Sequence, residues 1–313
     1  MPFGQSCEKQ GFSVFTFQLN YLSVFNFQIS VFNFQISAFT YMITYPNAKI
    51  NIGLNITEKR PDGYHTIETV FYPIGLCDTL QIERSETCDD YSFSASGIQI
   101  DAESENNLII RAYRLLQSEY DVPPLDISLI KHIPFGAGLG GGSSDAAFML
   151  KAMNELLELN ISNKKLETIA AKLGADCPFF IKNKPVYATG IGNEFTSVRL
   201  SLKNYYLLLV KPDIHVSTPE AYSLITPCQP EKPLLELIRQ PIHQWKHTVK
   251  NDFEQPIFVR YPEIGNIKQS LYDMGAIYAS MSGSGSSVFG LFENQPEYTS
   301  AFDDYFVTGG LLA

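Results

Sequence analysis

A glycine-dense loop between a strand and a helix is the feature that most constrains this chain. Phe135-Gly-Ala-Gly-Leu-Gly-Gly-Gly-Ser-Ser144 follows a strand that ends at His132-Ile-Pro134, and it precedes Asp145–Leu157, whose apolar spacing predicts a helix. Glycines let backbone N–H groups approach a ligand, and the start of a helix presents such groups at the positive end of its dipole. The loop therefore predicts a site for a phosphate group.

Other glycine motifs fit this loop less well. Gly136, Gly138 and Gly141 match the spacing G-x-G-x-x-G of dinucleotide-binding enzymes. That motif needs an acidic residue at the end of a strand about 20 residues later, whereas Glu155 and Glu158 fall in or at the end of a helix. A Gly-Lys-Ser/Thr sequence does not follow, which excludes a Walker A loop. A flexible linker is the plain alternative, but linkers seldom run from a strand directly into an amphipathic helix.

The net charge of the chain limits the classes of partner that it is expected to bind. The chain has a formal net charge of −10, so non-specific binding to nucleic acid or to an anionic membrane is not expected. A phosphate would have to be bound by local amide groups. We therefore expect small-molecule substrates, no nucleic-acid partner and no membrane partner. Five scattered cysteines without a C-x-x-C pair favour the cytoplasm.

The N-terminal segment differs from the rest of the chain. Ser23–Ile29 and Ser30–Ile36 both read SVFNFQI, and residues 11–48 carry no charge. The repeat lacks the charged positions of a coiled coil, the basic start of a signal peptide and the apolar run of a membrane helix. We expect residues 1–41 to be a low-complexity extension outside the fold, and our hypothesis is that Met42 is the true initiator.

The rest of the chain is long enough for two domains, and a compositional break near residue 203 places a boundary there. We predict an N-terminal domain over 42–203 and a C-terminal domain over 204–313. Strand and helix patterns alternate in both halves, which indicates an α+β protein. The expected strands are Ile50–Ile56, Thr79–Glu83, Tyr91–Ile100, Leu125–Ile130, Tyr205–Val210, Ile277–Met281 and Val288–Phe292; the expected helices are Asn107–Gln117, Asp145–Leu157, one capped by Ser162, one capped by Thr218 and Ile264–Met274.

Two residues could serve phosphoryl transfer. Lys49 and Asn51 alternate with apolar residues and so share one polar face of a strand. Asp176 follows a helix stop at Gly174. Taken singly, Lys49 could be a solvated edge charge and Asp176 a turn or cap residue. Near a bound γ-phosphate, however, the lysine would offset developing charge while the aspartate orients a hydroxyl and accepts its proton.

Other candidates carry weaker signals. Tyr64-His65 follows the turn Arg60-Pro-Asp-Gly, where an aromatic pair could stack on a base or simply pack against the protein. His243 and His247 have the i, i+4 spacing of metal ligands, but no third ligand lies nearby in the sequence. Cys177 is more consistent with a small buried thiol than with a nucleophile.

Three segments together resemble the GHMP small-molecule kinases: Pro46-Asn-Ala-Lys-Ile-Asn51, Pro134–Ser144 and Ser282-Gly-Ser-Gly-Ser-Ser287. Arg60-Pro-Asp-Gly-Tyr-His65 and Leu173-Gly-Ala-Asp-Cys-Pro178 are more specific. They are similar to the branch of that family that phosphorylates the 2-hydroxyl of a cytidine diphosphate ester of methylerythritol in isoprenoid precursor synthesis. The resemblance covers residues 42–313.

The resemblance implies an N-terminal domain like ribosomal protein S5 domain 2 and a ferredoxin-like C-terminal domain. It implies Lys49 as catalytic lysine and Asp176 as base, although orienting the hydroxyl could be the larger task of Asp176. The acceptor would contact Asn51, Tyr64, His65, Thr218 and Tyr222. ATP would lie over Pro134, Phe135, Gly136, Ala137, Gly138, Leu139, Gly140, Gly141, Gly142, Ser143 and Ser144. Mg²⁺ is expected with ATP, without an assigned protein ligand.

Rival interpretations remain at this point. One is another GHMP kinase that acts on mevalonate, homoserine or a sugar. A second, of another class, is a nucleotide-binding module without catalysis, and a dehydrogenase is the third. The sequence leaves the oligomeric state open.

Overall fold

A computed structural model describes residues 41–98, 106–297 and 300–312, and it confirms the expected α+β class. The described strands form three four-stranded sheets, and helices pack on them. Residues 1–40 of the predicted extension lie outside the described residues. The expected boundary at residue 41 is one residue too late, because Tyr41 belongs to the first strand and pairs with Glu83. Met42, which follows Tyr41, is buried in the first strand at 3% exposure.

The first sheet has the order β1 (Tyr41–Thr44), β4 (Thr79–Arg84), β6 (Leu125–Lys131) and β5 (Tyr91–Gly97). Neighbouring strands are antiparallel except β5, which runs parallel to β6. The predicted strands in this region are confirmed, and the last two residues of the expected Tyr91–Ile100 lie outside the described residues. Along β6 every second residue is buried, which is the pattern of a sheet with one covered face.

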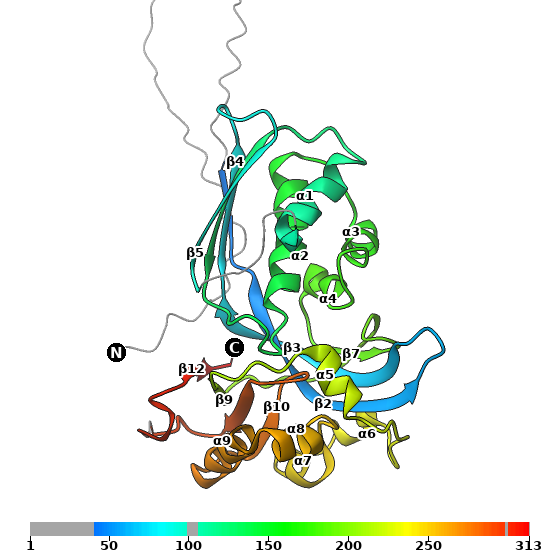
Figure 1. Ribbon diagram of the computed structural model, residues 1–313, viewed down its shortest axis with the longest axis vertical. Helices are drawn as coiled ribbons and strands as arrows, with labels where there is room; N and C mark the ends of the chain where they lie inside the picture. The colour runs from blue at the N-terminus through cyan, green and yellow to red at the C-terminus, as the bar shows by residue number, and fades with distance from the viewer. Residues whose placement is uncertain (1–40, 99–105, 298–299, 313) are drawn as a thin grey trace, which may run out of the picture.

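Four helices lie on that side of the sheet: α1 (Leu108–Gln117), α2 (Gly141–Leu156), α3 (Asn163–Ala170) and α4 (Cys177–Lys182) (Figure 1). Helix α2 packs against β1 and β4, and α3 and α4 pack against α2 on its far side. Asn107 caps α1 and Ser162 caps α3 by accepting hydrogen bonds from backbone N–H groups. Helix α2 begins at Gly141, four residues before the expected start. The reason is that residues of the glycine loop already form helical hydrogen bonds, such as that from Ser144 N–H to Gly140 O at 2.9 Å.

The second sheet has the order β2 (Asn47–Lys59), β3 (His65–Cys77), β7 (Val186–Thr189) and β8 (Glu194–Ser197), and every neighbouring pair is antiparallel. The expected turn connects β2 to β3, and it is closed by a hydrogen bond from Arg60 N–H to Tyr64 O at 2.8 Å. Strand β3 was not predicted. Figure 1 shows the long β2–β3 hairpin between helices α1–α4 and the C-terminal part of the chain.

The third sheet is antiparallel throughout, with the order β10 (Tyr278–Met281), β11 (Val288–Phe292), β9 (Tyr206–Lys211) and β12 (Phe306–Leu311). It confirms the three strands expected here. The helical segments of this half are α5 (Thr218–Ser223), α6 (Leu234–Leu237), α7 (Ile242–Thr248), α8 (Glu254–Arg260), α9 (Pro262–Asp273) and the 3-10 turn η2 (Ser300–Phe302). Figure 1 shows α7, α8 and α9 gathered on the lower side of this region.

Strand β2 is buried on both faces. On one face, Ile50 and Ile52 share a hydrophobic cluster with Leu207 of β9. The expected polar face is therefore not solvated, because Lys49 is 4% and Asn51 is 2% exposed. The interpretation of Lys49 as a solvated edge charge is wrong. A charge that is buried this deeply must be compensated by neighbouring groups.

Candidate active site

Lys49 and Asp176 lie together, although 127 positions separate them in the sequence. The Lys49 ammonium nitrogen is 3.6 Å from Asp176 Oδ2. Asp176 occupies the N-cap position of α4, yet its side chain makes no capping hydrogen bond. Its carboxylate is 34% exposed, so it is free to face a substrate while it partners the lysine.

The Lys49 side chain is anchored on both sides. Its Nζ donates hydrogen bonds to Asn51 Oδ1 at 2.6 Å and to the Gly138 carbonyl oxygen at 3.0 Å. It also lies 4.9 Å from the ring centroid of Phe71. Burial lowers the pKa of Lys49, and the negative charge of Asp176 opposes that shift. The ammonium group is thus held at one point next to the glycine loop.

Asn51 is itself held by a polar residue that the sequence did not single out. Its Nδ2 donates to Thr69 Oγ1 at 3.0 Å, and Thr69 in turn donates to the Gly53 carbonyl oxygen at 2.6 Å. Thr69 is fully buried in β3, the strand that was not predicted. Both ends of the Asn51 amide are therefore engaged, and its oxygen orients Lys49.

The glycine loop carries its ligand-binding capacity in the backbone. Gly136, Gly138 and Gly140 all have positive φ angles, which few other residues adopt without strain. Gly140 is the N-cap of α2 and offers no capping side chain. The first N–H groups of this 16-residue helix therefore have no side-chain cap, which is the arrangement that binds phosphate groups.

Alternate side chains of the loop anchor it in the core. Ala137 and Leu139 are 2% and 1% exposed and belong to the hydrophobic cluster around β2, while Phe135 is 66% exposed. The Leu139 carbonyl oxygen accepts from Lys49 N–H at 3.0 Å. The loop is thus fixed to the strand that carries the catalytic candidate.

The segment Ser282–Ser287, the third motif of the sequence analysis, contacts the same glycine loop. Ser282 Oγ donates to the Gly138 carbonyl oxygen at 2.9 Å and accepts from Asn51 N–H at 3.2 Å. A Cβ atom on Gly138 would lie 1.9 Å from the Ser282 carbonyl oxygen. The close approach of these two backbones explains why glycine is needed at position 138. The three motifs of the sequence analysis therefore meet in one network.

A buried ion cluster, which the sequence analysis missed, holds both ends of the glycine loop. Lys131 Nζ donates to Asp145 Oδ2 at 2.7 Å and also to Asp78 Oδ2. Asp78 Oδ1 accepts from the N–H groups of His132 and Ile133 at 2.6 and 2.8 Å. Burial, together with the negative charge of Asp78, raises the pKa of Asp145 to about 8 although Lys131 opposes this shift. The cluster joins the residues before the loop to the first turn of α2.

Of the three aromatic candidates, His65 and Tyr222 are in contact, whereas Tyr64 is exposed. His65 stacks on Tyr222 with ring centroids 4.7 Å apart and an interplanar angle of 17°. Tyr64 is 61% exposed. A centroid spacing of 4.7 Å is at the short end for aromatic pairs, so no third ring fits between His65 and Tyr222. Burial and the nearby charge of Asp176 raise the pKa of Tyr222 to about 12, which keeps it a neutral phenol.

Thr218 begins helix α5 but does not cap it. The cap is Ser217, whose Oγ accepts from Glu220 N–H at 3.3 Å. The predicted cap was therefore one residue too late, because Pro219 fits the second position of the helix as well as the first. Thr218 Oγ1 is instead 3.5 Å from Ser284 Oγ of the third motif.

Cys177 and the pair His243 and His247 are the remaining candidates. Cys177 is fully buried, and burial raises the pKa of its thiol to about 11, which confirms the interpretation as an inert core thiol. His243 and His247 lie on α7, and no group of three or more His, Cys, Asp or Glu residues within 41–98, 106–297 and 300–312 is arranged to bind a metal ion. No helix in these ranges is long and apolar enough to cross a bilayer.

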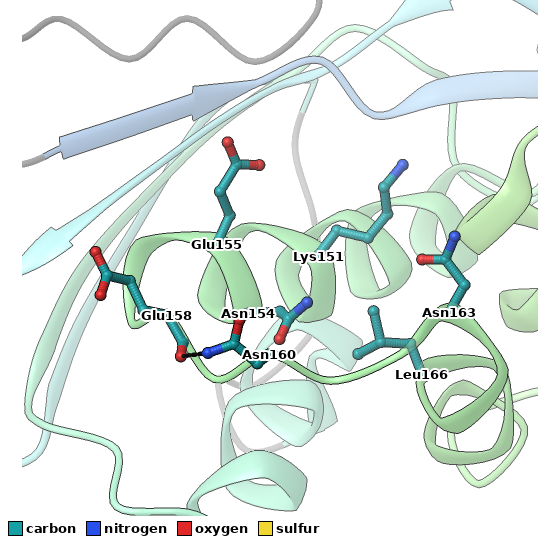
Figure 2. Close-up of a pocket in the computed structure, with 7 residues that line it drawn as sticks. All are labelled: Lys151, Asn154, Glu155, Glu158, Asn160, Asn163 and Leu166. Atoms are coloured by element: carbon teal, nitrogen blue, oxygen red, sulfur yellow. Dashed lines mark hydrogen bonds between the residues drawn. The ribbon is translucent and has the colours of Figure 1, made fainter.

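A polar pocket of about 450 Å³ lies elsewhere (Figure 2). It is lined by residues from the C-terminal half of α2, from α3 and from their connection: Lys151, Asn154, Glu155, Glu158, Asn160, Asn163 and Leu166. The glycine loop is at the opposite end of α2, so none of the candidate catalytic or binding residues contributes to this pocket.

Comparison with known proteins agrees with the geometry. The family model for the GHMP kinases N terminal domain matches residues 107–184, and the model for the GHMP kinases C terminal matches residues 232–302. A 4-diphosphocytidyl-2-C-methyl-D-erythritol kinase of Parabacteroides distasonis is 58% identical over 275 residues, which cover 87% of this chain and 100% of that protein. The protein of that name from Bacteroides fragilis is 59% identical over 82% of this chain and 94% of its own length.

Solved structures give the same grouping. A crystal structure of 4-(cytidine 5'-diphospho)-2C-methyl-D-erythritol kinase is 32% identical, with a TM-score of 0.70 over 80% of this chain and 90% of that one. The Methanococcus jannaschii mevalonate kinase is 12% identical with a TM-score of 0.63 over 89% of this chain and 99% of that one, and it shares the fold. This chain belongs to the GHMP kinases, a family of ATP-dependent small-molecule kinases, and groups there with relatives named 4-diphosphocytidyl-2-C-methyl-D-erythritol kinase.

Proposed function

We propose that this chain transfers the γ-phosphoryl group of ATP to the 2-hydroxyl of 4-diphosphocytidyl-2-C-methyl-D-erythritol, a step in isoprenoid precursor synthesis. The observation that carries the proposal is the Lys49–Asp176 pair, 3.6 Å apart, next to a glycine loop at the start of a helix. The relatives that share 58% and 59% identity with the chain bear the name of this kinase, which supports the choice of acceptor.

In the proposed reaction, the acceptor oxygen forms a bond to the γ-phosphorus while the bond to the bridging β–γ oxygen breaks, and ADP leaves. The acceptor hydroxyl would donate its hydrogen bond to Asp176, whose carboxylate orients it and takes its proton. Lys49 would stabilise the charge on the transferred phosphoryl oxygens. Its two fixed hydrogen bonds to Asn51 and Gly138 hold the ammonium in place without reorganisation during the reaction.

ATP would lie along Pro134–Ser144, with its phosphates near the N–H groups at the start of α2. These backbone donors explain how a protein with a net charge of −10 could bind two anionic substrates. Mg²⁺ would accompany ATP. It is commonly bound by one or two carboxylates together with substrate phosphates, so it needs no dedicated cage of protein ligands.

The acceptor would be recognised at the other end of the site. Tyr64, His65 and Tyr222 offer aromatic faces for the cytosine, while Asn51 and Thr218 lie beside the catalytic pair and the third motif respectively. Because His65 and Tyr222 already stack on each other, the base would bind over this pair rather than between its rings. We further propose the division into domains 42–203 and 204–313 and a cytoplasmic location.

A coupled assay of ADP formation with several acceptors tests the function. The purified chain is given ATP, Mg²⁺ and, in separate reactions, 4-diphosphocytidyl-2-C-methyl-D-erythritol, mevalonate, homoserine and galactose. We expect turnover with the cytidylyl acceptor and a product that carries its new phosphate ester at the 2-position. Turnover with mevalonate, homoserine or galactose in its place would contradict the proposal. The absence of ADP formation with every acceptor would favour a non-catalytic nucleotide-binding protein.

A further inference from the structure

The segment before helix α8 joins the strand that carries Lys49. Leu54 N–H donates to the Lys250 carbonyl oxygen at 2.8 Å, and Asp252 N–H donates to the Leu54 carbonyl oxygen at 2.8 Å. Asn251 pairs with Leu54 as an isolated parallel bridge. A short piece of the C-terminal half is thereby fixed to β2 a few residues after the catalytic candidate.

From this position the Asn251 side chain forms hydrogen bonds at the third motif. Its Nδ2 donates to the carbonyl oxygens of Met281 and Gly283 at 2.8 and 2.9 Å. Its Oδ1 accepts from Phe253 N–H at 3.0 Å, and the residue is 3% exposed. The carboxamide thus bonds to the residues on either side of Ser282, and both of its Nδ2 hydrogens are used.

Ser282 connects Asn251 to the two residues that contact Lys49. Its Oγ donates to Gly138 O and accepts from Asn51 N–H. Gly138 and Asn51 are the same two residues that accept hydrogen bonds from Lys49 Nζ. A displaced Ser282 would therefore remove one backbone hydrogen bond from each of the two residues that hold the ammonium, at Gly138 O and at Asn51 N–H.

A second residue supports the same loop. Glu254 Oε1 accepts from Met281 N–H at 2.8 Å and from Ser280 Oγ at 3.1 Å, and its Oε2 accepts from Lys268 Nζ at 2.6 Å. Glu254 fixes the strand side of the motif, whereas Asn251 reaches past Ser282 to Gly283. Asn251 thus bonds to both neighbours of Ser282 along the chain.

We propose that Asn251 is a positioning residue of the phosphoryl-transfer site, which acts through Ser282 to hold the glycine loop and Lys49 in register. The inference rests on the proposed function for its kinetic readout, but its hydrogen-bond chain stands independently of the acceptor. An amide is required because it donates twice. A carboxylate of the same shape would face two carbonyl oxygens without a proton to share.

The test compares Asn251→Asp with Asn154→Asp. Asn154 is a matched control, because its amide also clamps a backbone, donating to Ile161 O at 3.1 Å and accepting from Ile161 N–H at 2.8 Å, at the pocket of Figure 2. We expect Asn251→Asp to lower kcat on the order of 100-fold, the cost of a small misplacement of reacting groups. The KM for the cytidylyl acceptor should stay within about threefold, since His65 and Tyr222 are untouched.

A double-mutant cycle with Asn251→Ala and Ser282→Ala separates positioning from general stability. If Asn251 acts through Ser282, the double variant loses no more kcat than the more impaired single variant. Multiplied losses would overturn the inference, as would a folded Asn251→Asp enzyme with the kcat of the Asn154→Asp control. If Asn251→Asp does not fold, a kcat for Ser282→Ala within about threefold of the unaltered enzyme overturns it as well.

A binding measurement keeps this inference distinct from the proposed function. The dissociation constant of a non-hydrolysable ATP analogue needs no acceptor, and Asn251→Ala should raise it about tenfold because Gly138 is released. An unaltered enzyme that is inactive with the cytidylyl acceptor would contradict the proposed function alone. An unchanged dissociation constant for Asn251→Ala would contradict the positioning role whatever the acceptor is.

Discussion

Gly138 and Ser282 approach so closely that a Cβ atom on the glycine would lie 1.9 Å from the serine carbonyl oxygen. This contact joins the glycine loop to the third motif, and the hydrogen bond from Ser282 Oγ to Gly138 O reinforces it. Since Gly138 O also accepts from Lys49, this one backbone contact constrains both the glycine loop and the Lys49 ammonium group.

The variant Gly138→Ala should therefore impair catalysis strongly. The methyl group cannot be accommodated beside a backbone carbonyl, and alanine is strained at a φ of +74°. We expect kcat/KM for ATP to fall on the order of 100-fold, as measured by steady-state kinetics. Gly75→Ala is the matched control, because nothing lies within 4 Å of its added methyl group. Equal activities of the two variants would contradict the contact.

The buried ion cluster predicts a large loss of stability for Lys131→Met. This change leaves the Asp78 carboxylate buried without its cation and removes the donor to Asp145, and an uncompensated buried charge typically costs about 3–5 kcal/mol. Chemical denaturation measures the free energy of unfolding. The control Lys172→Met removes an exposed ion pair with Glu119, which should cost about 0–1 kcal/mol. Equal losses for the two variants would contradict a larger stabilising contribution from the buried cluster than from an exposed ion pair.

Asp145 also predicts how stability depends on pH. Its pKa of about 8 in the folded chain lies above the value of about 3.9 expected for an unfolded aspartate. The folded state therefore binds an extra proton between these values. The contribution of Asp145 to the free energy of unfolding is fully present below about pH 4 and is lost as the pH rises through about 8.

The variant Asp145→Asn cannot titrate and should lose this part of the pH dependence. Thermal unfolding of both proteins at pH 6 and pH 9 measures the effect: the decrease in Tm between these values should be smaller for Asp145→Asn. A decrease of the same size in both proteins would exclude Asp145 as its source.

The stacked pair predicts a change in acceptor binding. Loss of base stacking costs about 1–3 kcal/mol, so Tyr222→Ala should raise the KM for the cytidylyl acceptor about 5- to 150-fold. Tyr222→Phe retains the ring and should keep the KM near that of the unaltered enzyme. A rise of the KM in Tyr222→Phe as large as in Tyr222→Ala would mean that the hydroxyl, rather than the ring, is used.

Much of the fold could be predicted from local patterns. The strand at Leu125–Ile130, the helix at Asn107–Gln117 and the cap Ser162 depend on neighbours in sequence, and the structure confirms them, with Asn107 as the cap rather than the first residue of its helix. Strand β3 was missed because Pro73 and Gly75 interrupt its pattern, although Pro73 still pairs with Lys49 of β2.

The candidate site was harder to predict, because its contacts are long-range. Lys131 and Asp78 lie 53 positions apart. The Asn251 side chain bonds to the backbone carbonyl oxygens of Met281 and Gly283, a contact that no local pattern reveals. One signal was present: Lys131 continues the buried alternation of Leu125, Ile127 and Leu129. A lysine on an apolar face needs a buried partner, and that requirement could have led to the cluster.

The most direct test of the account is the turnover of Asp176→Asn with ATP and 4-diphosphocytidyl-2-C-methyl-D-erythritol. The amide cannot accept the proton of the acceptor hydroxyl, so kcat should fall on the order of 10²- to 10⁴-fold while the affinity for a non-hydrolysable ATP analogue is retained. The control Asp273→Asn alters an exposed carboxylate bonded to Gln269 and should keep full activity. Near-normal turnover of Asp176→Asn would contradict the assignment of the Lys49–Asp176 pair as the catalytic centre.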